Sequence, residues 1–251
     1  MNKNAWIVGS FGLLCACPSV TNLKNARALD KGEYELTIAA EAGGVSVPTT
    51  SANAGGSVVY PQFEFAGRWG VADGFDLGFK VYPVGAEFDA TVQLLRGGLS
   101  LTLDPGVGIF GIVLFNGGTG NSSENASYVS IPVHLDLLAG IGSAEGTQFV
   151  IGPGLYTFFT LSGATAGGTS ESESAITLMA GGTVGVSFAL SNTFRIMPEF
   201  DIYFPVAGAV NSASSTQAGF AATGAFIYAV ALGFSFGNGP ADGRHASATT
   251  H

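Results

Sequence analysis

Residues 222–236, ATGAFIYAVALGFSF, alternate large apolar side chains with small or weakly polar ones. The even positions from Phe226 to Phe236 are all large and apolar. The odd positions are Thr, Ala, Gly or Ser, with Ile227 as the one exception. The stretch is apolar enough for a membrane helix, but only a strand sends successive side chains to opposite faces. A strand with one apolar face and one face of small or polar side chains is typical of a barrel wall between lipid and lumen.

The end of this stretch, LGFSF at residues 232–236, has aromatic residues two positions apart. It resembles the closing strand that the outer-membrane assembly machinery reads in bacterial β-barrel proteins, here of the small, OmpA-like class. The resemblance implies the barrel assembly machinery and outer-membrane lipids as partners, and it leaves the oligomeric state open. It also implies an assembly signal made of Tyr228, Gly233, Phe234 and Phe236.

The composition points to the same class. Only 11% of residues are charged, against roughly 25% in a soluble domain, and 38 of 251 residues are glycine. A soluble protein with so little charge would expose large apolar patches, so lipid is the expected solvent. A secreted, soluble β-sandwich is the alternative. Nucleic acid is not an expected partner, because the formal charge is -9 and there is no basic run to contact phosphates.

Nine further segments repeat the period of two. With the closing strand they predict an all-β, transmembrane, antiparallel up-and-down barrel of about ten strands over residues 33–236. Asp104-Pro105-Gly106 is a turn signal, but the apolar parity continues through it, which predicts one long strand. The other predicted strands cover residues 33–42, 58–69, 75–82, 88–94, 99–115, 128–139, 148–160, 175–190 and 194–204.

The connections alternate in length, as they do in barrels with short periplasmic turns and long outer loops. The segment at 85–87 is an exception among the outer connections, because it is a hairpin with almost no loop. The predicted outer loops are 43–57, 116–126, 162–174 and 205–221, and the predicted short turns lie near 70–74, 97–98 and 191–193.

The N-terminus has the features of a secretory signal, with Lys3 followed by an apolar run too short to span a membrane. LCAC at residues 14–17 resembles the lipobox of bacterial lipoproteins. The resemblance implies a signal peptide at 1–16 and a lipid anchor on Cys17. The competing cleavage site is ARA at residues 26–28. Residues 17–32 are then a periplasmic leader, and residues 237–251, which lack periodicity, are a disordered periplasmic tail.

The inward faces of the predicted strands carry a network of charged side chains, in which carboxylates outnumber cations. The predicted function is a non-catalytic outer-membrane barrel with a structural or surface-interacting role. The alternative is a narrow cation-preferring pore or small-solute transporter, since surplus negative charge favours cations if water passes. The network comprises Glu64, Arg68, Asp76, Lys80, Asp89, His134, Asp136, Arg195, Glu199 and Asp201.

A second alternative is an outer-membrane hydrolase or acyltransferase that uses His134 and Asp136. Ser130 faces inward on the same strand, but at about 3.3 Å per residue it lies about 13 Å from His134, too far for a nucleophile and its base. His134 and Asp136 are close enough to couple, with Asp104 across the neighbouring strand. No spacing of metal ligands and no phosphate-binding loop is present, so no cofactor is expected.

Overall fold

The computed structural model describes residues 19–47, 56–116, 124–166, 169–212, 215–218 and 226–238. No helix in these ranges is long and apolar enough to cross a membrane. The strands are β1 (Tyr34–Val47), β2 (Gly56–Ala72), β3 (Phe75–Tyr82), β4 (Gly85–Leu95), β5 (Leu99–Asn116), β6 (Glu124–Gly142), β7 (Thr147–Ala166), β8 (Thr169–Ser191), β9 (Phe194–Ser212), β10 (Ser215–Ala218) and β11 (Phe226–Gly237).

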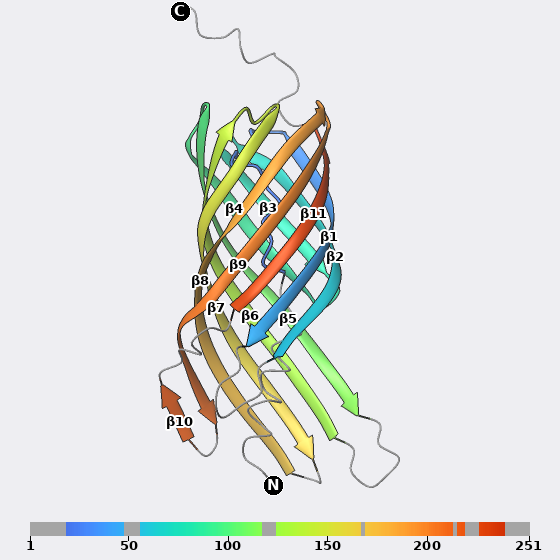
Figure 1. The fold of residues 1–251 in the computed structure, drawn as a ribbon, viewed down its shortest axis with the longest axis vertical. Coiled ribbons are helices and arrows are strands. Elements are labelled where there is room, and N and C mark those ends of the chain that lie inside the picture. Colours follow the sequence, from blue (N-terminus) through green and yellow to red (C-terminus); the bar gives the residue numbers. More distant parts are fainter. Residues whose placement is uncertain are drawn as a thin grey trace, which may run out of the picture.

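Ten of the eleven strands form a closed antiparallel ring. Consecutive strands from β1 to β9 are hydrogen-bonded neighbours, and β11 closes the ring by pairing with both β9 and β1. The short β10 pairs with the end of β9 outside the ring. Figure 1 shows the resulting barrel. The all-β, ten-strand, up-and-down architecture predicted from the sequence is confirmed.

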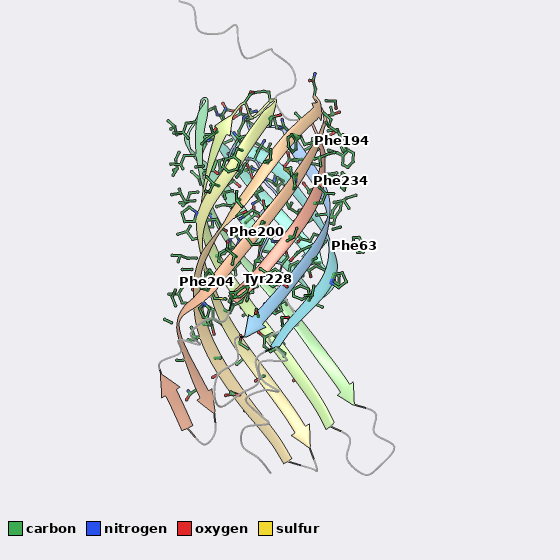
Figure 2. All side chains as sticks on the ribbon, in the orientation of Figure 1. Phe63, Phe194, Phe200, Phe204, Tyr228 and Phe234 are labelled. Carbon is green, nitrogen blue, oxygen red and sulfur yellow. The ribbon has the colours of Figure 1, made fainter. Side chains whose placement is uncertain are left out.

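The outer surface of the barrel is apolar where the strands keep the period of two. Phe63 is 72% exposed and Phe88 is 65% exposed, whereas the polar residues between such positions are buried. Figure 2 shows rings such as Phe63 projecting from the wall. Other outward residues include Leu36, Ile38, Trp69, Ile131, Val133, Leu135, Phe200, Phe204, Val230 and Leu232, all at least 39% exposed.

β5 passes through the Asp104-Pro105-Gly106 turn signal without a break, as the apolar parity predicted. Asp104 pairs with Asp136 and Gly106 pairs with His134 on β6. Glycine is needed at position 106, because a Cβ atom there would collide with the imidazole ring of His134. Gly106 therefore leaves space in the lumen for the His134 side chain of the next strand.

The strands β6 to β9 are 19 to 23 residues long, about twice the 9 to 11 residues that a tilted membrane strand needs. They extend beyond the ends of β1, β2 and β11 (Figure 1). The predicted loops at 162–174 and 205–221 are therefore wrong in part, since β7, β8 and β9 continue into them. Small polar residues replace apolar ones there, which removed the alternation that the prediction relied on.

The N-terminal part of the chain lies inside the barrel. Each of residues 19–29, here called the luminal segment, is at most 9% exposed. The segment runs inside the ring of strands toward the end where the short turns at 73–74 and 192–193 lie (Figure 1). The sequence interpretation of residues 17–32 as a periplasmic leader is corrected for this segment. The predicted signal peptide at 1–16, the anchor Cys17 and the tail beyond residue 238 lie outside the described residues.

Candidate functional site

The barrel lumen holds the charged side chains that the sequence assigned to it. Nine of the ten network residues are at most 9% exposed, and only Arg195 is partly exposed. Lining carboxylates that the prediction did not include among the site residues are Glu35, Glu41, Glu87 and Asp104. The wall therefore brings ten carboxylates into the lumen against Arg68, Lys80 and Arg195. Burial of so much like charge is unfavourable unless cations or hydrogen-bond donors compensate it.

Lys24 of the luminal segment supplies one such cation. Its Nζ atom lies 2.6 Å from Oδ1 of Asp89 on β4 and 2.7 Å from Oδ2 of Asp104 on β5. The Thr91 hydroxyl donates a hydrogen bond to the other Asp104 oxygen, at 3.1 Å. The ammonium group is thus held by two buried carboxylates from adjacent strands. We call Asp89, Thr91 and Asp104 the ammonium site.

Two further carboxylates of the wall bind the start of the luminal segment. Glu64 accepts hydrogen bonds from the hydroxyls of Ser19 and Thr21. Glu199 accepts the backbone N–H groups of Asn22 and Leu23, at 2.6 and 2.9 Å. Leu23 has a φ of 48°, an unusual conformation for a bulky residue. At this bend, the N–H groups of two successive residues, Asn22 and Leu23, both point toward the carboxylate of Glu199.

The rest of the luminal segment is also held through its backbone. Three N–H groups donate to wall side chains, at 2.7 to 2.8 Å, and two carbonyls accept from buried wall cations, at 2.9 and 3.1 Å. The wall contacts the peptide backbone on both its donor and acceptor sides. The pairs are Ala26 with Gln148, Ala28 with Gln93, Leu29 with Asp76, Thr21 with Lys80 and Arg27 with Arg68.

Arg68 organises the charges near the turn end. Its Nε and Nη2 atoms donate to the two oxygens of Asp76, at 3.1 and 2.6 Å, and Nη1 lies 3.5 Å from Glu35. Asp76 is fully buried. This bidentate pair links β2 and β3 to the luminal segment, because Asp76 also accepts the Leu29 N–H and Arg68 also donates to the Arg27 carbonyl.

The pair of His134 and Asp136 forms, with Nδ1 of the ring 2.7 Å from the carboxylate. The other ring nitrogen faces Glu87, at 3.4 Å, and Glu87 is paired with Lys80, at 3.1 Å. Ser130 is hydrogen-bonded to Thr160 and not to the imidazole. Within the described residues no nucleophile lies at this histidine. The geometry is that of a polar network in a barrel interior.

Aromatic rings form a buried cluster in the lumen on the side of the loops. Tyr82 stands next to the tight turn at 83–84, and Tyr156 packs edge-on against Tyr203, with centroids 4.8 Å apart. Val20 of the luminal segment packs into this cluster. The aromatic layer comprises Tyr82, Phe110, Tyr128, Tyr156, Phe158 and Tyr203.

The residues of the predicted assembly signal all lie on β11. Phe194 on β9 stacks on Phe236 with centroids 4.9 Å apart, and Phe226 contacts Tyr228. Gly233 faces inward, where a Cβ atom would touch Leu23 of the luminal segment. The closing strand therefore contacts the luminal segment. Recognition by an assembly machinery stays a prediction.

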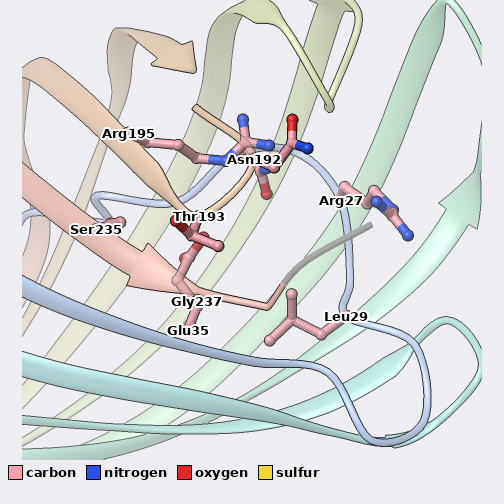
Figure 3. Close-up of a pocket in the computed structure, with 9 residues that line it drawn as sticks. Arg27, Leu29, Glu35, Asn192, Thr193, Arg195, Ser235 and Gly237 are labelled. Atoms are coloured by element: carbon pink, nitrogen blue, oxygen red, sulfur yellow. The ribbon is translucent and has the colours of Figure 1, made fainter. Parts of the chain in front are cut away.

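A small pocket opens at the turn end, between the luminal segment, β9 and β11. Figure 3 shows Arg27 and Leu29 on one side of it and Asn192, Thr193 and Arg195 on the other. Its volume of about 20 Å³ suffices for a single water molecule. Within the described ranges, no group of three or more His, Cys, Asp or Glu residues is arranged to hold a metal ion.

The turn end of the luminal segment is fastened by Asp30. The hydrogen bonds from Arg96, both 2.7 Å long, lower the pKa of the Asp30 carboxyl from its usual value near 3.8 to about 2. Because the pKa is lowered on folding, the stabilisation is fully present above about pH 4 and is lost as the pH falls from about 4 to about 2. We expect Arg96→Ala to reduce the unfolding free energy by less than about 1 kcal/mol at pH 7, since Arg96 is exposed, and by almost nothing at pH 2. Denaturant titrations at both pH values measure this. An equal loss at both pH values would contradict it.

The sequence did contain a signal for the luminal segment. Lys24 and Arg27 are the two cations of a short region that precedes a wall with surplus inward carboxylates. The predicted network has fewer cations than carboxylates, and Lys24 supplies one more by pairing with Asp89 and Asp104. The amide side chains of Gln93 and Gln148 gave no comparable signal, because a lone inward glutamine is typical of any polar lumen.

No protein-family model and no curated protein matches the chain. Among solved structures, the outer membrane protease OmpT from Escherichia coli is 7% identical, with a TM-score of 0.50 over 84% of this chain and 98% of that chain. The translocator domain of the autotransporter NalP from Neisseria meningitidis is 10% identical, with a TM-score of 0.49 over 93% and 95%. Neisserial surface protein A is 8% identical, with a TM-score of 0.39 over 81% and 96%. Similarity at these identities shows the fold alone, which is that of bacterial outer-membrane β-barrels.

Proposed function

We propose that the chain is a non-catalytic outer-membrane barrel that is closed at rest by its own luminal segment, with a structural or surface-interacting role. The observation that carries the proposal is the burial of residues 19–29 among the wall carboxylates. The segment packs against small residues of the wall, with Val20 in the cluster that contains Ala229 and Leu23 in the cluster that contains Ala231. The outer membrane is the compartment that suits both the fold and the apolar outer surface.

The surface-interacting role is supported by the length of β6 to β9. About half of each of these strands is left over once 9 to 11 residues are assigned to the bilayer. These extensions form a continuous wall on one side of the barrel (Figure 1). A wall that stands beyond the membrane is suited to contacts with partners outside the cell.

The closed state is tested by electrical recording of the purified full chain in its unacylated form in planar bilayers. We expect no channel steps in potassium or sodium salts, because the luminal segment occupies the lumen and packs against the aromatic layer. Reproducible cation-selective steps that become smaller in Glu64→Gln or Asp201→Asn would overturn the closed barrel. They would instead support the narrow cation-preferring pore.

Lipid attachment at Cys17 is a separate proposal that rests on the lipobox-like LCAC sequence. It has a structural consequence. Ser19 is fully buried in the lumen, and two residues span at most about 7 Å. A chain held in the bilayer by acyl groups on Cys17 would have to keep residues 19–29 outside the lumen. The lipid anchor and the closed barrel therefore describe alternative states of one molecule.

Cys17→Ala distinguishes these states. We expect the variant to lose incorporation of labelled palmitate and to stay in the outer-membrane fraction, because its apolar outer surface does not depend on the lipid. We further expect acylated wild-type molecules to conduct and unacylated molecules to be silent. Mass spectrometry of the mature N-terminus is the matching control. Cleavage after Ala28, at the competing ARA site, would remove most of the luminal segment and contradict both proposals.

A further inference from the structure

We infer that the lumen is a binding channel for extended basic peptides, and that the luminal segment occupies it as the chain's own ligand. The inference rests on the proposed closed barrel and deepens it by assigning a class of ligand to the space that residues 19–29 fill. Three features of the contact between wall and segment support it: the way the backbone is bound, the ammonium site, and the shape of the pockets for side chains.

The wall binds the segment mainly through hydrogen bonds to its extended backbone. Five N–H groups of the segment donate to carboxylate or amide oxygens of the wall, and two of its carbonyls accept from wall cations. Every peptide carries these donors and acceptors at the same spacing. A lumen built in this way can bind an extended chain that is not covalently joined to β1.

The ammonium site adds specificity for a basic residue. Asp89 and Asp104 lie on the adjacent strands β4 and β5, so the wall alone supplies both carboxylates. Two carboxylates in contact with one ammonium group form a strong, charge-assisted site. A peptide with a lysine at the matching position would satisfy both of them.

The neighbouring positions define the preferred side chains around that lysine. Leu23 fills a small apolar pocket of Ala39, Met197 and Ala231. Ala26 and Ala28 are fully buried where larger side chains would collide with the wall. The preferred ligand therefore carries a leucine directly before the lysine, and alanine two and four positions after it.

The lumen would attract such a peptide once it is empty. Among the described residues, Glu41, Asp201 and one oxygen of Glu64 accept no hydrogen bond from the luminal segment. Without Lys24 and Arg27 the wall would hold its ten carboxylates against only three cations. A concave, low-dielectric space with one sign of charge concentrates ligands of the opposite charge.

The test uses a variant that lacks residues 19–29 and a synthetic peptide with their sequence, SVTNLKNARAL. Folding of the variant is checked by its heat-modifiable migration, and binding is measured as block of its cation current and by fluorescence anisotropy of labelled peptide. The matched control peptide carries norleucine, which has no charge, in place of the lysine. The matched control of the wall is the same deletion with Asp89→Asn and Asp104→Asn.

We expect the native peptide to block the current, and the norleucine peptide to bind at least about tenfold more weakly. The Asp89→Asn, Asp104→Asn variant should bind both peptides equally. Equal binding of the two peptides to the deletion variant, or block by spermidine as strong as by the native peptide, would overturn the inference. If the deletion variant folds only when peptide is added, the folded fraction becomes the readout, with the same order of peptides expected. The unacylated full chain is recorded in parallel. If the full chain is silent but the peptide does not bind to the deletion variant, only this inference is refuted. If the full chain conducts, the closed barrel is refuted.

Discussion

Replacing Lys24 with alanine is expected to open the barrel and to lower its stability by about 3 to 5 kcal/mol. Among the described residues, the substitution removes the one cation within hydrogen-bond distance of both Asp89 and Asp104, at 2.6 and 2.7 Å. Asp104 is fully buried, so its charge cannot be compensated by water. The two carboxylates would then repel each other and release the centre of the luminal segment. Denaturant titration of the purified barrel measures the loss, and cation current in planar bilayers measures the opening.

Lys31→Ala is the matched control, because Lys31 is exposed and follows the luminal segment by two residues. We expect this variant to keep the stability of the wild type within about 0.5 kcal/mol and to stay silent. Adding Asp89→Asn and Asp104→Asn to Lys24→Ala should restore much of the stability, because neutral amides do not need the ammonium group. A silent Lys24→Ala variant with unchanged stability would show that the ammonium site does not hold the segment.

The wall of this barrel could be predicted from the sequence because each strand obeys a local rule. Alternation places Phe63 and Phe65 outward and Glu64 inward, and no distant residue is needed to decide it. The same rule correctly predicted that β5 continues through Asp104-Pro105-Gly106 without a turn. It failed where Ser, Thr and Gly lie on both faces, so the ends of β7 and β9 were predicted too early and the start of β8 too late. Those extensions need no apolar face if they lie beyond the lipid.

The luminal segment could not be predicted from such a rule. Residues 19–29 have no alternation, and their position depends on partners that are 41 to 177 residues away in the sequence, such as Arg68 for Arg27 and Glu199 for Asn22. The composition did contain the reason, since the predicted lumen had too few cations for its carboxylates. Only the closed ring shows that Lys24 can reach Asp89 and Asp104 together.

The pair of Arg68 and Asp76 is expected to have an effect as large as that of Lys24. Arg68→Ala would leave the fully buried Asp76 with the backbone N–H of Leu29 as its remaining donor. It would also remove the hydrogen bond to the Arg27 carbonyl. We expect a loss of about 3 to 5 kcal/mol in the unfolding free energy, measured by denaturant titration with tryptophan fluorescence.

Two comparisons separate the buried charge pair from simple loss of packing. Arg68→Lys keeps the charge but loses the bidentate geometry, so its stability should lie between those of the wild type and Arg68→Ala. Arg96→Ala removes an arginine of the same size whose side chain is 44% exposed, and should cost less than about 1 kcal/mol. Adding Asp76→Asn to Arg68→Ala removes the unpaired charge and should recover part of the loss. If Arg68→Ala and Arg96→Ala lowered the unfolding free energy by similar amounts, the partly exposed arginine at the rim would contribute as much as the buried one. The buried pair would then not be what fastens the luminal segment to the wall.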